Sequence, residues 1–214
     1  MARGDWDLDD YRDLLDAAGA GGYRFALFDV EPEEGLLFLR HDVDLTLHAA
    51  LVMARLEAEL GIATTYLLMT ESLFYNLASP EGTETIEELR QLGHRVGLHA
   101  VYPNVELDDR FDRVVAWHNP EPAYMTQPIA GALNVMGEPY FDPQVYRSDS
   151  NQHWRRGDPR EELRAGSFPW LQLLIHPAIW VYPGATMGET MRAMLEAERE
   201  RRLGQLPGDR ITMG

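Results

Sequence analysis

The sequence predicts an α/β fold in which parallel strands alternate with helices. Its apolar residues form runs that are too short for helices and are typical of buried parallel strands. Segments with helical spacing of apolar residues separate these runs, so residues 36–99 are predicted as strand, helix, strand, helix, strand. This order is the pattern of right-handed parallel α/β units, whose strands end at the crevice where ligands bind.

The N-terminal half has the clearest periodicity. The predicted elements are, in chain order, a helix over residues 5–18, a strand or extended lead-in over 23–30, a strand over 36–44, a helix over 46–60, a strand over 62–69, a helix over 84–92 and a strand over 95–99. Aspartates favour the start of the first helix, since they oppose the positive end of its dipole. Gly61 and Gly93 stand where the second and third helices should end.

The segment over residues 119–170 has a different character. It is rich in proline and has little periodicity, so we expect long loops with short strands near 124–130 and 145–149. Long loops in a compact domain are more often functional than idle. A strand over 171–175 and a helix over 186–202 complete the predicted elements.

The composition excludes several classes of protein. The net charge of −16, from 35 acidic and 19 basic residues, argues against a broad nucleic-acid-binding surface and against binding to anionic membranes. A substrate that is neutral or carries a neutral or cationic group fits this charge better, although solubility alone is the more common role of such a charge. No apolar run approaches 18 residues, so no membrane span is expected. The chain has no cysteine and no apolar signal segment at its N-terminus, so we expect no disulfide or thiolate site and a cytoplasmic location.

Four apolar runs end in a histidine, and one of these histidines is followed by two aspartates. The four histidines are His41, His99, His118 and His176. Polar residues that follow parallel strands converge at one edge of the sheet. Imidazoles and carboxylates together are the ligands and acid–base groups of divalent-metal sites. The sequence therefore predicts a metal site at this edge.

The segment His41-Asp42-Val43-Asp44 places two carboxylates on one side of the chain. Side chains alternate along a strand, so Asp42 and Asp44 point the same way as Arg40, whereas the histidine and the valine point the other way. Two carboxylates this close repel each other unless a cation is near, so one could bind a metal while the other acts as a base. The structural alternative is a turn in which Asp44 or Thr46 caps the next helix.

Five short motifs carry a family resemblance. They are Leu-Arg-His-Asp-Val-Asp at 39–44, Gly-Ile-Ala-Thr-Thr-Tyr at 61–66, Leu-Gly-His-Arg-Val-Gly-Leu-His at 92–99, Ser-Asp-Ser at 148–150 and Leu-Leu-Ile-His-Pro at 173–177. Together they resemble the polysaccharide deacetylase superfamily (NodB homology, carbohydrate esterase family four). The resemblance implies an incomplete or distorted (β/α) barrel that removes an N-acetyl group from a carbohydrate or saccharide precursor with the help of a metal.

The resemblance also implies roles for four residues. Asp42 would be the catalytic base and His176 the general acid. Asp44 and His99 would bind a divalent metal, most commonly Zn²⁺. The whole chain would be a single domain with three parts, namely an N-terminal helix and lead-in over 1–35, a barrel core over 36–185, and a C-terminal helix and tail over 186–214.

Two features depart from the family pattern. Val43 separates the two aspartates, which is a form that some branches of the superfamily use. Pro103 occupies the position of another metal-binding histidine, and proline cannot bind a metal. His118 is the best replacement ligand, with a structural or substrate-binding role equally open, and Asp149 is the competing candidate.

Other side chains are expected around the site. Asp149 could instead hold an arginine in place beside Asp42, the candidates being Arg40, Arg147 and Arg155. Trp154, with Trp170 and Trp180, could stack on a sugar ring, although such residues are more often part of a core.

Two expectations concern the surroundings of histidines. Pro177 should turn the chain away from helix after the last strand and so fix His176 at the strand end. His94 should be exposed at a helix end, where its charge suits the dipole.

Two other functions remain open from the sequence. Pro103 at a ligand position favours a catalytically inactive, carbohydrate-binding relative. A metal-dependent hydrolase or deformylase that acts on another amide would use the same residues.

Overall fold

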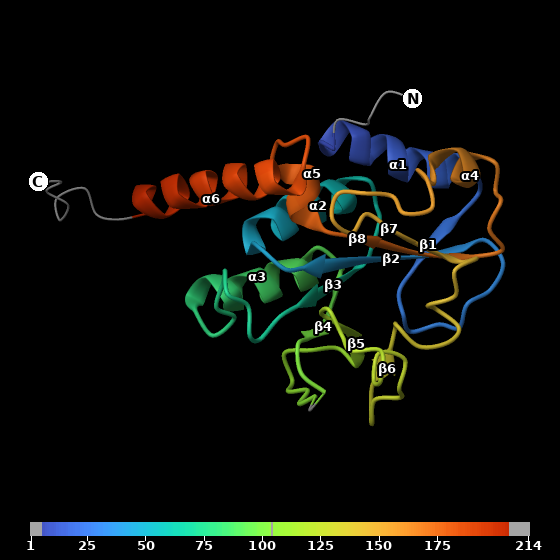
Figure 1. Cartoon of the computed structure of the whole chain (residues 1–214), viewed down its shortest axis with the longest axis horizontal. Helices are drawn as coiled ribbons and strands as arrows, with labels where there is room; N and C mark the ends of the chain where they lie inside the picture. Colours follow the sequence, from blue (N-terminus) through green and yellow to red (C-terminus); the bar gives the residue numbers. More distant parts are fainter. Residues whose placement is uncertain (1–5, 104, 206–214) are drawn as a thin grey trace, which may run out of the picture.

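Parallel strands form the centre of the molecule. The computed structural model describes residues 6–103 and 105–205, so Asp5, the predicted start of the first helix, and the predicted tail over 206–214 lie outside the described residues. Seven strands pair in the order β6-β5-β4-β3-β2-β8-β7, β1 pairs with β2, and all these pairings are parallel. The sheet curls into a half-barrel, which confirms an α/β fold of the incomplete-barrel kind (Figure 1).

The elements follow the predicted order over most of the chain. The strands are β1 (Arg24–Ala26), β2 (Leu36–Val43), β3 (Thr65–Leu68), β4 (Arg95–Ala100), β5 (Val114–Trp117), β6 (Leu133–Asn134), β7 (Tyr146–Ser148) and β8 (Leu171–Ile175). The helices are α1 (Leu8–Ala20), α2 (Leu47–Glu59), α3 (Pro80–Gln91), α4 (Arg160–Arg164), α5 (Pro177–Val181) and α6 (Met187–Gly204). None of the described helices is long and apolar enough to cross a bilayer.

Strand β2 divides the core into two faces. It is buried along its whole length between β3 and β8, which explains its nearly unbroken apolar sequence. Leu37 and Leu39 pack with residues of α1, α2 and α5 on the face that these helices cover (Figure 1). Phe38 packs with Tyr140 on the opposite, concave face. Arg40 and the first aspartate of the motif follow Phe38 on that face by alternation, so the curl of the sheet turns them inward.

Helix α2 begins directly after the motif. Thr46 is its N-cap, and its hydroxyl accepts a hydrogen bond from the backbone N–H of His48. Asp44 therefore has no capping role and is free for the site. Helix α3 begins at Pro80, four residues before the predicted start, because Ser79 caps it and proline is tolerated in the first turn.

The proline-rich segment contains two elements that were not predicted, β6 and α4, and lacks one that was. The strand predicted near 124–130 is wrong, because this stretch forms turns with one isolated bridge, and the short strand β6 comes later. The strand near 145–149 is confirmed as β7. The five-residue helix α4 was not predicted from the sequence, being too short to show a period.

Two expectations about histidine surroundings are wrong. Pro177 starts helix α5 with His176 as its N-cap residue, because the fixed φ angle and missing N–H of proline suit the first helical turn. His94 is only 2% exposed, and it accepts a hydrogen bond from the Thr64 N–H while its Nε2 lies 3.0 Å from the Ala54 carbonyl oxygen. Burial lowers the pKa of His94, so it serves as a neutral structural link rather than as a charge at a helix end.

A candidate metal and catalytic site

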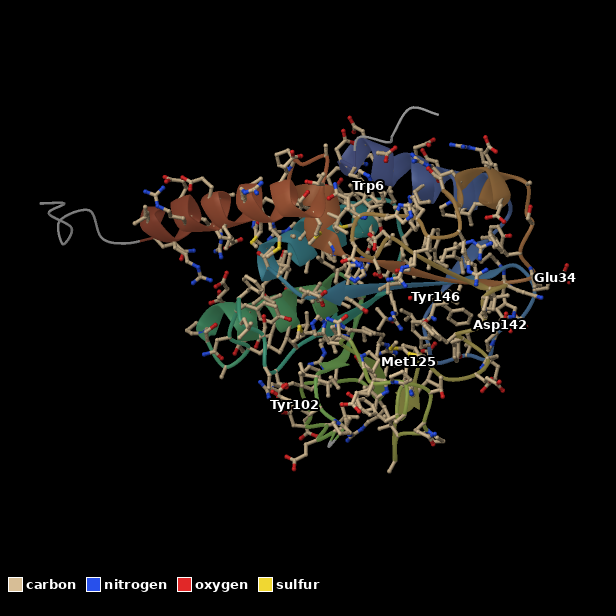
Figure 2. All side chains as sticks on the ribbon, viewed as in Figure 1. Trp6, Glu34, Tyr102, Met125, Asp142 and Tyr146 are labelled. Carbon is tan, nitrogen blue, oxygen red and sulfur yellow. The ribbon has the colours of Figure 1, made fainter. Side chains whose placement is uncertain are left out.

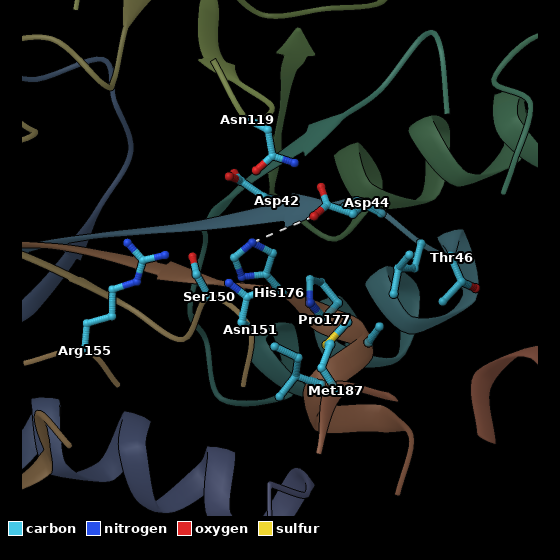
Figure 3. A pocket seen from close by; sticks show the side chains of 14 residues that line it. Asp42, Asp44, Thr46, Asn119, Ser150, Asn151, Arg155, His176, Pro177 and Met187 are labelled. Atoms are coloured by element: carbon cyan, nitrogen blue, oxygen red, sulfur yellow. Dashed lines mark ion pairs between the residues drawn. The ribbon is translucent and has the colours of Figure 1, made fainter. Parts of the chain in front are cut away.

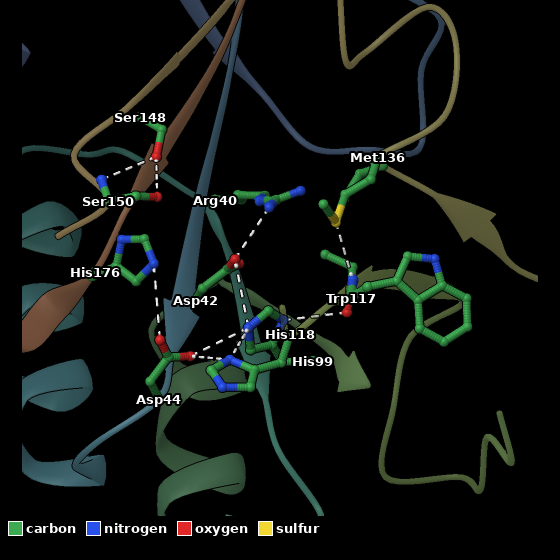
Figure 4. Close-up of polar contacts among 12 residues, drawn as sticks. Arg40, Asp42, Asp44, His99, Trp117, His118, Met136, Ser148, Ser150 and His176 are labelled. Carbon is green, nitrogen blue, oxygen red and sulfur yellow. Dashed lines mark hydrogen bonds and ion pairs between the residues drawn. The ribbon is translucent and has the colours of Figure 1, made fainter. Parts of the chain in front are cut away.

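Three strand ends bring together a carboxylate and two imidazoles. Asp44 follows β2, His99 lies near the end of β4, and His118 directly follows β5 (Figure 4). Asp44 Oδ1 lies 3.2 Å from His99 Nε2 and 3.4 Å from His118 Nδ1, and the two ring nitrogens are 3.2 Å apart. These three residues form a group that could hold a metal ion. The sequence predicts Asp44 and His99 as metal ligands and His118 as the best candidate for the third, and the structure brings these three side chains together.

The surroundings of His99 orient its ring toward this group. His99 is 2% exposed, and its Nδ1 lies 3.2 Å from the Ala116 carbonyl oxygen on the neighbouring strand. The carbonyl can only accept, so Nδ1 carries the proton and Nε2 offers its lone pair to the site. A backbone acceptor behind a ligating imidazole is a regular feature of metal sites.

Asn119 holds the ring of His118 from the other side. Its side-chain amide lies 3.1 Å from His118 Nε2, and its backbone has a φ of 48°, in the left-handed region that asparagine tolerates better than most residues. The atom that faces Nε2 is the amide nitrogen Nδ2, so metal binding through Nδ1 requires the amide to turn over and its oxygen to accept the Nε2 proton.

The electrostatics of Asp44 favour a cation at this point. Burial raises the pKa of Asp44, but its contacts with His118 and His99 outweigh burial and hold the pKa well below its usual range. Its Oδ1 atom is buried and makes no hydrogen bond to any described residue. A carboxylate that stays charged beside two imidazole nitrogens has the donor set of a divalent-metal site.

Asp42 lies deeper in the same crevice. It is 3% exposed, and its Oδ2 accepts a hydrogen bond of 3.1 Å from Arg40 Nη2 and lies 3.7 Å from His99 Nε2. Its Oδ1 is buried and makes no hydrogen bond to a described residue. Arg40 therefore pairs with Asp42 on the side of the strand that parity predicted, and the pair engages only one of the two carboxylate oxygens.

His176 faces Asp44 across the cavity shown in Figure 3. Its Nε2 lies 3.9 Å from Asp44 Oδ2, and its Nδ1 lies 2.6 Å from Asp149 Oδ1. Burial lowers the pKa of His176, but the charge and hydrogen bond of Asp149, with further help from Asp44 and Asp42, raise it to about 9. His176 is therefore protonated at neutral pH and holds a proton that faces the cavity.

Asp149 holds His176 rather than an arginine. Both of its oxygens accept from the His176 backbone N–H, and Oδ2 also accepts from Trp180 Nε1 at 2.7 Å. The suggestion that Asp149 orders Arg40, Arg147 or Arg155 is wrong, because Arg40 pairs with Asp42, Arg147 with Glu162, and Arg155 makes no ion pair with a described residue. Its engaged oxygens also leave Asp149 outside the group that could hold a metal.

The tryptophans divide between the core and the cavity wall. Trp180 is 1% exposed and belongs to the core. Trp154 is half-buried, stacks on Trp6 with ring centroids 5.7 Å apart, and also lines a cavity beside the site (Figure 2 labels Trp6). Trp170 packs edge-to-face against Phe38 and Tyr140 of the core.

Sequence reasoning missed a buried carboxylate behind the site. Glu57 of α2 is fully buried, and its oxygens lie 2.7 Å from His41 Nε2 and accept hydrogen bonds from Tyr11 and Tyr66. A glutamate inside a helix is normally assigned to solvent. The signal that could have found it is its spacing, because Glu57 lies four residues after Met53 on the same buried stripe.

Comparisons with known proteins give no relative. No family model matches the chain, and neither the curated proteins nor the solved structures contain a significant match.

Proposed function

We propose that this chain is a metal-dependent hydrolase that removes an N-acetyl group from a carbohydrate or a saccharide precursor. The observation that carries the proposal is the convergence of Asp44, His99 and His118 beside a buried carboxylate, Asp42, that has an unpaired oxygen. A metal site with a neighbouring base and a protonated histidine has the groups that hydrolysis of an amide requires.

The spacing of the three ligand atoms supports zinc as the metal. The distances between them are 3.2, 3.4 and 3.2 Å. Ligands at the corners of a tetrahedron around zinc, with bonds of about 2.0–2.1 Å, are about 3.3 Å apart. A metal held there supplies a Lewis acid that polarises the amide carbonyl and acidifies water.

The residues of the chain then divide the proton transfers between them. Asp42 Oδ1 accepts a proton from the attacking water as the new carbon–oxygen bond forms, and this help is worth about 10²–10⁴ in rate. The hydrogen bond from Arg40 to Oδ2 holds the carboxylate of Asp42 in place for this step. When the carbon–nitrogen bond breaks, His176 Nε2 gives its proton to the departing amine. The products are acetate and a free amino sugar, and the two proton transfers balance.

The choice of an acetamido sugar rests on the family resemblance of the motifs at 39–44, 92–99 and 173–177. The inactive relative was suggested by Pro103 at a ligand position. Pro103 is exposed, and His118 from the next strand provides a third donor in its place. This substitution favours an active hydrolase over a silent binding protein.

The test is acetate release. The zinc-loaded protein is incubated with N-acetylated monosaccharides, sugar nucleotides, oligosaccharides and, as the control for other amides, N-formyl and N-acetyl amino acids. The proposal predicts release of acetate and a primary amine from an acetamido sugar and loss of this activity with a chelator. Release of acetate or formate from the amino-acid amides alone would show that the substrate is an amino-acid amide and not a sugar. Release from none of these compounds would overturn the proposal.

A further inference from the structure

Two arginines without partners lie beside the candidate site. Among residues 6–103 and 105–205, every arginine except Arg155, Arg156 and Arg192 contacts an acidic side chain or a carbonyl oxygen. All three are exposed, and Arg192 lies on α6, away from the candidate site. Arg155 and Arg156 line one cavity of about 430 Å³, so two of the three unpaired guanidinium groups share one place.

This cavity continues into the candidate site. A second cavity of about 200 Å³ is lined by Asp42, Asp44, His99 and His118, and it shares Arg155 and its neighbours Tyr146 and Ser148 with the first. Figure 3 shows Arg155 on the far side of His176 from Asp44. A ligand whose amide reaches Asp42 and Asp44 and that extends into the first cavity therefore passes Arg155.

Arg40 adds unused donors from the floor of the second cavity. It is 1% exposed and lines this cavity together with Arg155. Only its Nη2 has a partner, Asp42, whereas Nε and Nη1 are buried without one among the described residues. Asp42 therefore satisfies only part of this guanidinium, which places positive charge at the floor of the cavity.

The charged residues that line the two cavities are mainly basic, whereas the chain as a whole is acidic. Arg40, Arg147, Arg155 and Arg156 line the two cavities, and the acidic residues among the lining are Asp42 and Asp44. Both aspartates already face cationic or metal-binding partners. The chain has 35 acidic and 19 basic residues, so this concentration of arginine is a local feature and not an average one.

We propose that the substrate carries an oxyanion, a phosphate or a carboxylate, near its acetamido group, and that Arg155 and Arg156 bind it. Guanidinium groups match such oxyanions with paired, charge-assisted hydrogen bonds. This inference rests on the proposed deacetylation, since it names the substrate class of that same site. It also replaces the neutral or cationic substrate expected from the net charge, because a substrate responds to the local field inside its cavity.

The experiment measures binding separately from turnover. The zinc-loaded Asp42→Asn protein is titrated calorimetrically with N-acetylglucosamine, its 1-phosphate, its uridine diphosphate derivative and N-acetylmuramic acid, which carries a carboxylate. Wild type is also titrated with glucosamine and glucosamine 1-phosphate. These compounds carry no acetyl group, so they report binding without turnover even if the Asp42 variant is misfolded. Each titration is repeated with Arg155→Ala, with Arg156→Ala and with the matched control Arg192→Ala.

The inference predicts that at least one oxyanion-bearing sugar binds about tenfold or more tighter than its neutral counterpart. Added salt should weaken this preference, Arg155→Ala and Arg156→Ala should abolish it, and Arg192→Ala should leave it unchanged. Comparison of the sugar phosphates with N-acetylmuramic acid shows whether the site prefers a phosphate or a carboxylate.

Equal binding of neutral and anionic sugars, or unchanged binding by the Arg155 and Arg156 variants, would overturn the inference. The proposed function would then still stand if wild type releases acetate from a neutral sugar. Arginine-dependent binding of an anionic sugar without acetate release from any sugar would instead overturn the function and leave the oxyanion site in place.

Discussion

Asp149 Oδ1 lies 2.6 Å from His176 Nδ1, and the two residues directly follow the neighbouring strands β7 and β8, which pair in the folded sheet. The other oxygen of Asp149 accepts from Trp180 at 2.7 Å, so the carboxylate is fixed at both ends. This pair makes the proton on His176 stable at neutral pH and directs it into the cavity.

Asp149→Asn should shift the alkaline limb of the pH–rate profile. The general acid works while protonated, and the pKa of His176 is about 9. Without the charge of Asp149 the pKa should fall toward its ordinary value of 6.5. At pH 8 this change would lower the rate by about thirtyfold while leaving the rate at pH 6 much closer to wild type. Rates of acetate release from pH 5 to pH 10 would show it, and an alkaline limb at the wild-type position would contradict the role given to Asp149.

Asp42→Asn should abolish turnover and leave the metal bound. Asparagine has nearly the same shape but cannot accept the proton of water, so the expected loss is about 10²–10⁴ in kcat. Metal content is the internal control, because Asp42 lies outside the group of Asp44, His99 and His118. Turnover at the wild-type rate would show that Asp42 is not the base.

Asn119→Gly should weaken metal binding without weakening the fold. The φ of 48° at Asn119 suits glycine, so the backbone keeps its shape while the contact with His118 Nε2 is lost. Loss of a residue that orients a metal ligand costs about 10- to 100-fold in affinity. Competition with a chelator gives the affinity, and thermal unfolding of the metal-free protein gives the stability. Unchanged affinity would mean that Asn119 does not orient His118.

Acid should destabilise the fold through Glu57 and His94. Burial raises the pKa of Glu57, but the charge of His41 and the surrounding hydrogen bonds outweigh it and lower the pKa. A lowered carboxyl pKa gives stability that is present above the unfolded pKa of about 4.5 and is lost as the pH falls through the folded value. The pKa of His94 is also lowered, so its contribution is lost as the pH falls below its unfolded value of 6.5. The free energy of unfolding should therefore fall from pH 7 to pH 4.

Glu57→Gln separates the two contributions. It should destabilise the protein by about 3–5 kcal/mol at pH 7, because the buried partners of Glu57 lose the negative charge that they face. It should also reduce the loss of stability below pH 5, because the substituted side chain no longer takes up a proton there. Glu88→Gln, which removes a partly exposed pair with Arg55, is the matched control and should cost about 0–1 kcal/mol. Equal effects of the two substitutions would show that the network around Glu57 has no special part in stability.

The sequence predicts the strands and the inward carboxylates well because both follow from local alternation. The parity of β2 places Arg40, Asp42 and Asp44 on one side, and the structure has them there. Strand order is also implied by parallel α/β units, so the meeting of Asp44 with His99 follows once the sheet forms.

The remaining features depend on packing over long sequence distances. No local pattern shows that Asp149 would meet His176 and Trp180 rather than an arginine, since the partners lie 27 and 31 residues away. The burial of His94 and Glu57 depends on how α2 sits against β3 and β4, which the helical period alone does not give. Net charge averages over the whole surface, whereas Arg155 and Arg156 line one cavity, so net charge is a poor guide to the charge of a substrate.

The most direct test of the central claim is the metal content of a matched set of variants. Wild type, Asp44→Ala, His99→Ala, His118→Ala, Asp149→Asn and the exposed-histidine control His153→Ala are loaded with zinc, passed over a desalting column and measured by elemental analysis, with circular dichroism to confirm folding. The account predicts about one zinc per chain in wild type, His153→Ala and Asp149→Asn, and little or none in the three ligand variants. A folded His118→Ala protein that keeps a full zinc ion, or a wild type that keeps none, would contradict it.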